Sequence, residues 1–237
     1  MLYNEENVRA GIRNKDGKRV FYLGQGDNLT PSARDWLRQQ RIEILSSAQA
    51  KPDGYRLTSG AVFLDKPEHY THLRGNTLVP KTHPVIAFRG TMDTLQAELL
   101  LAQLASPEEI RKDLGQILEL ARKLISWEVM EEPVKLDTLC GLTMDEQRKR
   151  SHFPQEYYGQ PHFMPEYADG QALLQVNRAR CAARAAELAA AHAFVTADGC
   201  CSRQDLLKAL NRMSSMLYIL MIRLKAGKKE NYAKPSN

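Results

Sequence analysis

A chain of 237 residues, 43% of them hydrophobic and 26% charged, can bury a core of its own, so its folding requires neither disulfides nor a metal. Its longest apolar run, Met216 to Ile222, is far shorter than the roughly 20 residues that cross a bilayer, which argues against a membrane-spanning helix. The net charge of +5 comes from basic residues interleaved with acidic ones, which argues against a nucleic-acid-binding protein but permits a local site for an anion such as a triphosphate.

The first residues and the cysteines favour a reducing compartment. Residues 1–13 are acidic and polar where a signal peptide has its apolar stretch, so we expect a cytoplasmic protein. The cysteines lack the paired spacing of a zinc site, so we expect reduced thiols and no bound metal. They are Cys140, Cys181, Cys200 and Cys201.

Residues 1–64 predict a small α/β appendage. Thr30 and Pro31 mark the start of a helix, because threonine can cap it and proline suits its first turn. Short β-forming runs and a turn signal at Ser59-Gly60 predict strands around this helix and after it. The strands are expected at 19–23, 42–45, 55–57 and 61–64.

From residue 84 onward the helical period dominates. Apolar residues at helical spacing predict a helix that ends near Ser106, and a second that begins at Glu108 and continues to about Trp127. The short link between these helices indicates antiparallel packing. A weaker helix is predicted within 136–150, although Gly141 interrupts it.

An irregular segment rich in proline, glycine and aromatic residues, 151–170, precedes two more helices, at 171–196 and 203–225. The first is rich in alanine, so its neighbours can approach closely, and Ser202 is expected to cap the second. These patterns predict a mainly α fold, a ferritin-like bundle of four to five helices at 65–228. The α/β appendage precedes it, and a flexible tail at 229–237 follows it.

Polar residues interrupt the apolar pattern in three blocks. The first is Lys81 with the phrase Gly90-Thr91-Met92-Asp93-Thr94-Leu95. Lysine in an extended lead-in can contact a phosphate. Asp93, near the start of an apolar helix, needs a cationic partner unless it lies in water as a helix-dipole carboxylate.

The second block lies in the alanine-rich helix. Arg180, Arg184 and Glu187 follow an i, i+4, i+7 spacing and therefore project from one face, with Arg178 close by. Two fixed cations and an acid form a plausible cradle for a triphosphate. The alternative is a solvated face with an ion pair between Arg184 and Glu187.

The third block is Ala209-Leu210-Asn211-Arg212-Met213-Ser214-Ser215 in the last helix. Asn211 follows a core leucine, so its amide can reach a ligand or a neighbouring helix. In this order, the three blocks resemble the propanediol-utilization type of ATP:cob(I)alamin adenosyltransferases. Members of that family carry a lysine before a G-T-x-D-x-L helix, then an R-x-x-x-R-x-x-E helix and an N-R-L-S-D helix.

The loop phrase 153–167, the Thr71-His72-Leu73 lead-in and the extension at 29–37 are most similar to the ethanolamine-utilization branch. The resemblance covers residues 65–228. It implies that ATP binds between adjacent subunits of a trimer and that Asp93 and Arg180 form a catalytic ion pair, with Arg178 as the alternative partner of Asp93. The implied ATP-binding residues are Thr71, Lys81, Arg178, Arg180, Arg184, Glu187 and Asn211, the last two on the nucleotide or its Mg²⁺.

The resemblance also implies the chemistry and the partners. Cobalt(I) of the reduced cobalamin would attack the 5′ carbon of ATP and expel triphosphate. Phe163 and Phe153 would displace the lower ligand of the corrinoid, unless these loop aromatics only pack on the bundle. The product would supply ethanolamine ammonia-lyase, and the protein could associate with a bacterial microcompartment.

Three departures from the family pattern affect these expectations. Ser215 replaces the last aspartate of N-R-L-S-D, and the phosphate loop is poorly preserved at 71–76. The His and Cys-Cys-x-x-Cys metal cluster of some ethanolamine-branch members is missing after His83. The alternative function is a noncatalytic helical protein that senses or escorts a nucleotide or corrinoid.

Overall fold

The computed structural model describes residues 2–15, 17–24, 26–46, 54–63 and 65–233, with side chains to residue 227. The chain divides into two compact units, Met1–His83 and Pro84–Asn237.

The first part of the N-terminal unit is built around a three-stranded sheet in which β3 lies between β2 and β5, antiparallel to β2 and parallel to β5. A separate parallel pair joins β1 and β4. The elements are β1 (Leu2–Tyr3), α1 (Glu5–Gly11), β2 (Ile12–Lys15), β3 (Lys18–Leu23), β4 (Asn28–Leu29), α2 (Pro31–Gln39) and β5 (Glu43–Ser46). The strands predicted near 19–23 and 42–45 are confirmed.

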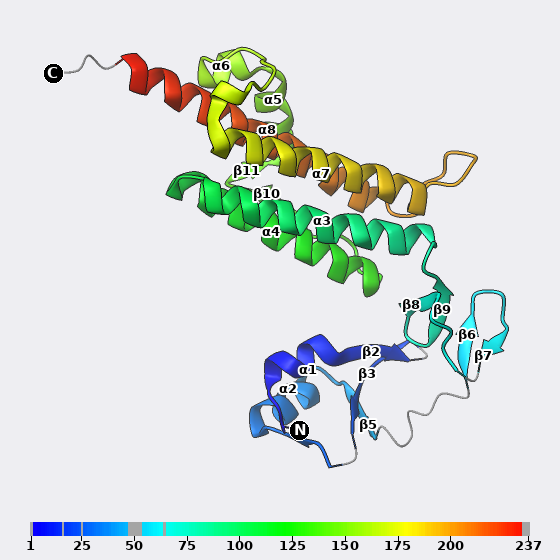
Figure 1. Cartoon of the computed structure of the whole chain (residues 1–237). Helices are drawn as coiled ribbons and strands as arrows, with labels where there is room; N and C mark the ends of the chain where they lie inside the picture. Colours follow the sequence, from blue (N-terminus) through cyan, green and yellow to red (C-terminus); the bar gives the residue numbers. More distant parts are fainter. Residues whose placement is uncertain (1, 16, 25, 47–53, 64, 234–237) are drawn as a thin grey trace. The chain divides into compact units, whose positions relative to one another are not determined.

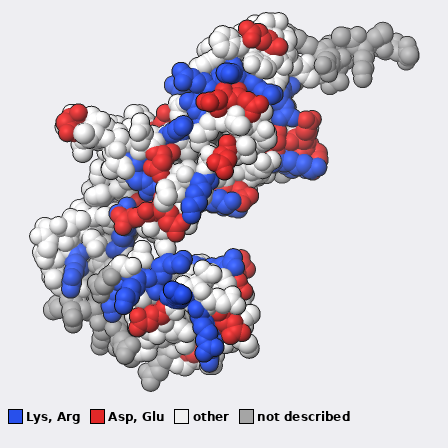
Figure 2. All heavy atoms as spheres, turned by 180° about the vertical axis from the view of Figure 1, so that it is seen from behind, with Lys and Arg blue, Asp and Glu red and all other residues white. Residues whose placement is uncertain are grey.

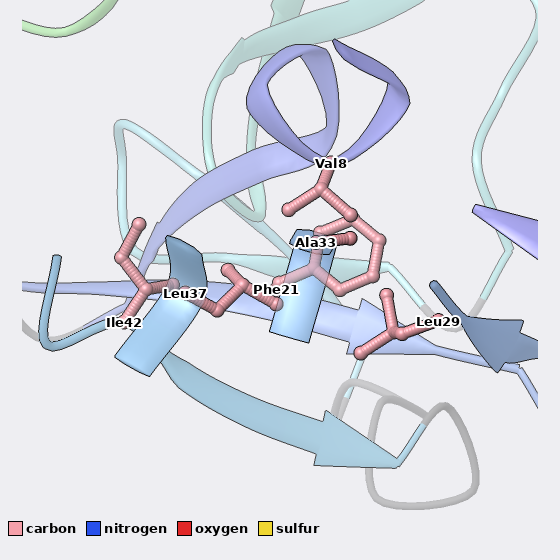
Figure 3. Packing of buried hydrophobic residues seen from close by; sticks show 6 residues of the cluster. All are labelled: Val8, Phe21, Leu29, Ala33, Leu37 and Ile42. Atoms are coloured by element: carbon pink, nitrogen blue, oxygen red, sulfur yellow. The ribbon is translucent and has the colours of Figure 1, made fainter. Parts of the chain in front are cut away.

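Helix α2 begins as predicted, because the Thr30 hydroxyl accepts from the Ala33 N–H at 3.3 Å and Pro31 occupies the first turn. Both helices contribute to a small core of six buried residues, whose side chains point toward one another in Figure 3. They are Val8, Phe21, Leu29, Ala33, Leu37 and Ile42. The appendage therefore has a hydrophobic core of its own.

A four-stranded sheet completes this unit in the order β7-β6-β9-β8. Its strands are β6 (Tyr55–Leu57), β7 (Val62–Phe63), β8 (Tyr70–Arg74) and β9 (Thr77–Pro80). The two strands predicted after the helix are present, apart from residue 64, which lies outside the described part. Because β6 pairs with β9, the sheet spans residue 64, and the domain boundary expected there remains a prediction.

Four long helices form the second unit, and Figure 1 shows them lying alongside one another. They are α3 (Pro84–Ala105), α4 (Glu108–Val129), α7 (Gly170–Phe194) and α8 (Gln204–Ala233). Their buried faces carry the apolar stripes read from the sequence, as in Met92, Leu95 and Leu99 of α3. The predicted mainly α helix bundle is confirmed.

Contacts between the helices give their directions. Arg89, near the start of α3, pairs with Glu128, near the end of α4, so these helices are antiparallel. Phe88 of α3 meets Phe194 at the end of α7, with ring centroids 5.6 Å apart, so α3 and α7 are antiparallel too. Helices α4 and α7 therefore run in the same direction, and the segment between them has to return along the bundle.

This return segment is more ordered than its sequence suggested. It contains β10 (Thr138–Leu139), β11 (Leu142–Thr143), α5 (Met144–His152), α6 (Pro154–Tyr158) and a 3-10 turn (Tyr167–Asp169). Of the helix predicted within 136–150, only the second half is helical, as α5. Thr143 and Glu146 form a capping box at its start. Cys140 and Gly141, with φ of 52° and 74°, form the hairpin turn before it.

Two predictions about the last helix need correction. The Ser202 hydroxyl donates to the Phe194 carbonyl at 3.2 Å instead of capping α8, and the Arg203 carbonyl accepts the first N–H groups of the helix. Helix α8 also continues to Ala233, into the predicted tail, and 234–237 lie outside the described residues.

Charged residues are interspersed by sign over the helical part, as Figure 2 shows for one face. Inside the bundle they are paired: Arg89 donates to both oxygens of Glu128, at 2.7 and 3.2 Å, although the Glu128 side chain is 0% exposed. A pair of this kind fixes helix register, because removing either partner leaves an uncompensated charge. No described helix is long and apolar enough to cross a membrane.

Candidate functional site

The seam between α7 and α8 contains Arg180, the first residue of the predicted arginine face. The Arg180 guanidinium carbon lies 5.3 Å from the centroid of the Tyr218 ring of α8. Its Nε is buried and has no hydrogen-bond partner within the described part of the chain. A buried donor of this kind is costly unless a ligand or another chain completes it.

Seven residues further along α7, Glu187 faces the same helix. Its Oε1 accepts from the Asn211 Nδ2 at 3.0 Å, so the polar residues of the second and third blocks meet across the seam, as their spacing predicts. Because Arg180 and Glu187 lie seven residues apart on α7 and both face α8, they mark two points along the seam, separated by roughly 10 Å at about 1.5 Å per residue. This length suits an extended polyanion.

An open hollow of about 630 Å³ lies at the Glu187 end of this line. It is lined by Glu187, Gln204, Asp205, Leu207, Lys208 and Asn211. The Asn211 Oδ1 and the second Glu187 oxygen are oxygen donors of the kind that hard divalent cations prefer. Among the described residues, no group of three His, Cys, Asp or Glu side chains is placed to hold a metal ion by itself.

The wall of this hollow contains a fixed carboxylate. Burial by itself raises the pKa of Asp205, but hydrogen bonds from Arg203 and the Val134 N–H, with the charge of Arg203, outweigh it and leave that pKa below its ordinary value. The Arg203 guanidinium also donates to the Glu132 carbonyl at 2.9 Å. This network ties the start of α8 to the segment that follows α4.

The other two arginines of the block differ from Arg180. Arg184 is exposed, and Glu187 bonds to Asn211, so the alternative ion pair between Arg184 and Glu187 is not formed. Arg178 lies with its Nε 2.8 Å from Glu98 Oε2 of α3, as an ion pair without hydrogen-bond geometry. Arg178 therefore links helices in this chain.

Asp93 does not meet an arginine of its own chain. It is exposed on α3 and forms no ion pair with any described residue, so the expected pair with Arg180 or Arg178 is absent within the chain. Its helix face continues into exposed apolar side chains at Leu100 and Leu104, which are 50% and 81% exposed. Asp93 thus lies at the end of an unpartnered face.

The loop aromatics are divided between contact and solvent. Phe163 lies 6.2 Å from the Tyr218 ring and under the Lys225 ammonium, whereas Phe153 is 55% exposed between α5 and α6. Lys225 also pairs with the buried Asp169, which fastens the end of the loop to α8.

In the N-terminal unit, Thr71 lies in β8 and Lys81 directly follows β9. Thr71 pairs with Val79, and the Lys81 N–H donates to the His69 carbonyl, so the two residues occupy neighbouring positions. The Lys81 ammonium lies 2.7 Å from Glu68, and both side chains are exposed. A surface pair of this kind is weak, so a phosphate can replace the carboxylate.

Tyr218 and His162 are the residues of this region that sequence reasoning missed or undervalued. Tyr218 lies within the apolar run of the last helix and His162 within the irregular segment at 151–170, and the sequence analysis assigned a role to neither. A hydroxyl-bearing aromatic at i+7 from Asn211 was the available signal, since it continues the polar line of α8.

The fold and this seam define a class, a helical bundle with polar and charged side chains between its last two long helices. The family model for cobalamin adenosyltransferase matches residues 64–224, and the chain belongs to that family. The resemblance inferred from the three blocks is thereby confirmed.

Two curated relatives extend the match over nearly the whole chain. Corrinoid adenosyltransferase EutT of Salmonella typhimurium is 28% identical, over 91% of this chain and 89% of that protein. EutT of Escherichia coli K12 is 26% identical over the same shares. A solved structure shares the fold at a TM-score of 0.50 and 16% identity, covering 69% of this chain and 91% of the other. It is a phenylalanine-to-alanine variant of a PduO-type ATP:corrinoid adenosyltransferase from Lactobacillus reuteri, complexed with cobalamin and ATP.

Proposed function

We propose that this chain is a corrinoid adenosyltransferase that moves the 5′-deoxyadenosyl group of ATP onto cob(I)alamin, giving adenosylcobalamin and triphosphate. The observation that carries the proposal is Arg180 on the α7–α8 seam, whose buried Nε has no hydrogen-bond partner among the described residues, in a chain that belongs to the cobalamin adenosyltransferase family. The cobalt(I) electron pair forms the bond to C5′, the C5′–O bond breaks, and triphosphate leaves with that bond's electrons.

The protein's contribution is position and charge. Arg180 and Arg184 would hold the triphosphate along the seam, where negative charge grows on the leaving group. Glu187 and Asn211 would contact the nucleotide at the hollow, and their free oxygens suit the Mg²⁺ that accompanies ATP. Thr71, Lys81 and Arg178 would also contact phosphate, and Arg178 would have to exchange its ion pair with Glu98 for that contact.

The loop at 151–170 would contact the corrinoid. Phe153 presents an apolar ring to solvent, where a ligand can cover it, and Phe163 lies next to the tyrosine that contacts Arg180. Apolar side chains against the lower face of the corrinoid would displace its axial ligand, which makes the cobalt easier to reduce.

The active form would be a homotrimer with sites between subunits. The support is the exposed face of α3, on which Asp93, Ala97, Leu100 and Leu104 follow helical spacing. Burying these leucines against another copy would also give Asp93 the cationic partner that the described residues of its own chain do not provide, and we assign this role to Arg180 of that copy. The catalytic pair would then form only on assembly.

The names of the curated relatives support a role in ethanolamine utilization. The product would then supply ethanolamine ammonia-lyase, from the cytoplasm or in association with a microcompartment. The appendage, which has a core of its own, is the candidate for such an association.

The test is direct. The purified chain, ATP with Mg²⁺, and cobalamin held as cobalt(I) by a strong reductant should yield the light-sensitive adenosylated product and one triphosphate per turnover. Binding of ATP and corrinoid without product would instead support the noncatalytic escort or sensor. Product formed equally well without the protein, or no binding of either ligand, would contradict both.

A further inference from the structure

Tyr218 stands at the centre of contacts that the proposed function has not used. One is the Arg180 guanidinium, 5.3 Å from its ring centroid. The second is His162, whose ring is parallel to the tyrosine within 6° and whose Nδ1 is 2.9 Å from the Tyr218 hydroxyl. The third is Phe163, with ring centroids 6.2 Å apart. A tyrosine thus connects the arginine helix with the aromatic loop.

We propose that Tyr218 is a positioning residue that holds the Arg180 guanidinium ready for the triphosphate, and that His162 holds Tyr218 in place. The proposal rests on the proposed function and names a residue through which the loop acts on the phosphate site.

The kind of partner distinguishes Arg180 from the structural arginines of the bundle. Arg89, Arg178, Arg203 and Arg223 each pair with a carboxylate. Such a partner neutralises the charge of the guanidinium, and in the hydrogen-bonded pairs it also occupies the N–H groups. An aromatic ring restrains an arginine differently, because contact with the ring leaves the charge intact and the N–H groups available to another acceptor. The described structure also gives the Arg180 Nε no hydrogen-bond partner.

The hydrogen bonds of His162 define what it does to Tyr218. Its Nε2 lies 3.1 Å from the His152 carbonyl oxygen, which can only accept, so Nε2 carries the proton. In the neutral ring, Nδ1 is then the acceptor, and the Tyr218 hydroxyl donates to it. The tyrosine is thereby anchored to the backbone of the loop that carries Phe163. A corrinoid that orders this loop would therefore also fix the position of the Arg180 guanidinium, through His162 and Tyr218.

The experiment compares two substitutions of Tyr218 in the full chain. Tyr218→Leu removes the ring, and we expect the KM for ATP to rise about five- to tenfold, because the guanidinium is no longer held. Tyr218→Phe keeps the ring face, and the KM for ATP should stay within about threefold of the original chain. The melting temperature of each variant shows whether a general loss of packing contributes.

A matched control is available in the N-terminal unit. Arg9 lies 5.0 Å from the Trp36 ring centroid, in a contact of the same kind that involves no residue assigned to ATP or the corrinoid. Trp36→Leu should therefore leave the KM for ATP unchanged. His162→Ala should raise it about two- to threefold, and should add nothing to Tyr218→Phe, because both remove the same hydrogen bond.

The outcomes separate this proposal from the proposed function. If the original chain makes adenosylcobalamin but Tyr218→Leu and Tyr218→Phe have equal KM values for ATP, the positioning role is wrong. A loss that follows the melting temperature in both variants would also overturn it. If the original chain binds ATP without turnover, the Kd for ATP replaces the KM and the same comparison decides. A chain that neither binds ATP nor turns over would sink both proposals.

Discussion

Arg178 and Arg180 lie two residues apart on α7 but meet neighbours of different kinds. Arg180→Ala should lower kcat/KM by about 100-fold, because it removes a donor to the departing triphosphate. It should cost less than about 1 kcal/mol of folding free energy, since the side chain gives up only its contact with Tyr218. Steady-state kinetics and thermal unfolding measure the two effects.

Arg178→Ala is the matched comparison and should show the opposite balance. It leaves the Glu98 carboxylate, whose side chain is 11% exposed, without its cation. We expect a loss of about 1–2 kcal/mol in stability and a smaller loss of activity than Arg180→Ala. Equal effects of the two substitutions on rate and stability would contradict the assignment of Arg180 to the triphosphate.

For single residues, the sequence predicts which side of a helix a side chain occupies better than it predicts what that side chain contacts. The i, i+4, i+7 spacing correctly placed Arg180 and Glu187 on one side of α7, because that depends only on helix geometry. The partner of Asp93 was not predictable, since it depends on which surfaces meet, and within this chain none of the described residues pairs with it. Tyr218 was missed because an aromatic in an apolar helix usually belongs to the core.

Asp205 shows how one element is attached to another. Its carboxylate accepts from Arg203 Nε and Nη2, both at 3.0 Å, and from the Val134 N–H at 2.9 Å. Its pKa is lowered in the folded protein, so the ionised form stabilises the fold above the unfolded pKa of about 3.9, and this contribution is lost as the pH falls through the folded pKa.

We therefore expect Asp205→Asn to lose about 1–2 kcal/mol of unfolding free energy between pH 5 and 8. Its deficit relative to the original chain should shrink below about pH 4. Urea unfolding across this pH range measures the difference. Asp137→Asn changes an exposed carboxylate with no ion pair among the described residues and should show no such trend. A deficit for Asp205→Asn that stays constant down to pH 2 would contradict the argument.

Elements with a strong period were predictable, and the compact return segment was not. The apolar stripes of α3, α4, α7 and α8 predicted these helices, since each buries a face of the required spacing. The hairpin turn at Cys140 and Gly141 was taken for an interrupted helix, because only glycine signals a left-handed turn clearly and Cys140 adopts φ of 52° without that signal. Burial raises the pKa of the Cys140 thiol to about 12, with the Asp113 charge contributing.

At the scale of the whole molecule, two compact units share one family match. The family match begins at residue 64, whereas the second compact unit begins at Pro84. The two boundaries differ because β9, which lies within the matched region, pairs with β6, which precedes it. The residue pattern indicated that mixed α/β structure gives way to helices along the chain. It did not indicate that one sheet would contain strands from before and after residue 64.

The exposed face of α3 is the surface through which we propose that the subunits of the trimer meet. Leu100, Leu101 and Leu104 are 50%, 43% and 81% exposed, on the face that Asp93 begins. Apolar side chains gathered on one helix face are typical of an interface, since water-exposed leucines are usually scattered. If three chains assemble through this face, Asp93 gains its arginine and the site is complete only in the trimer.

Leu100→Glu combined with Leu104→Glu should then shift the protein from trimer to monomer in analytical ultracentrifugation, because it places two like charges in an apolar contact. Adenosylation should fall by at least about tenfold while circular dichroism stays unchanged, since both side chains are exposed in the folded chain. Val62→Glu, at a position 51% exposed in the N-terminal unit, controls for added charge. A fully active monomer, or a double variant that remains a trimer at full activity, would mean that the Asp93 face is not where subunits meet.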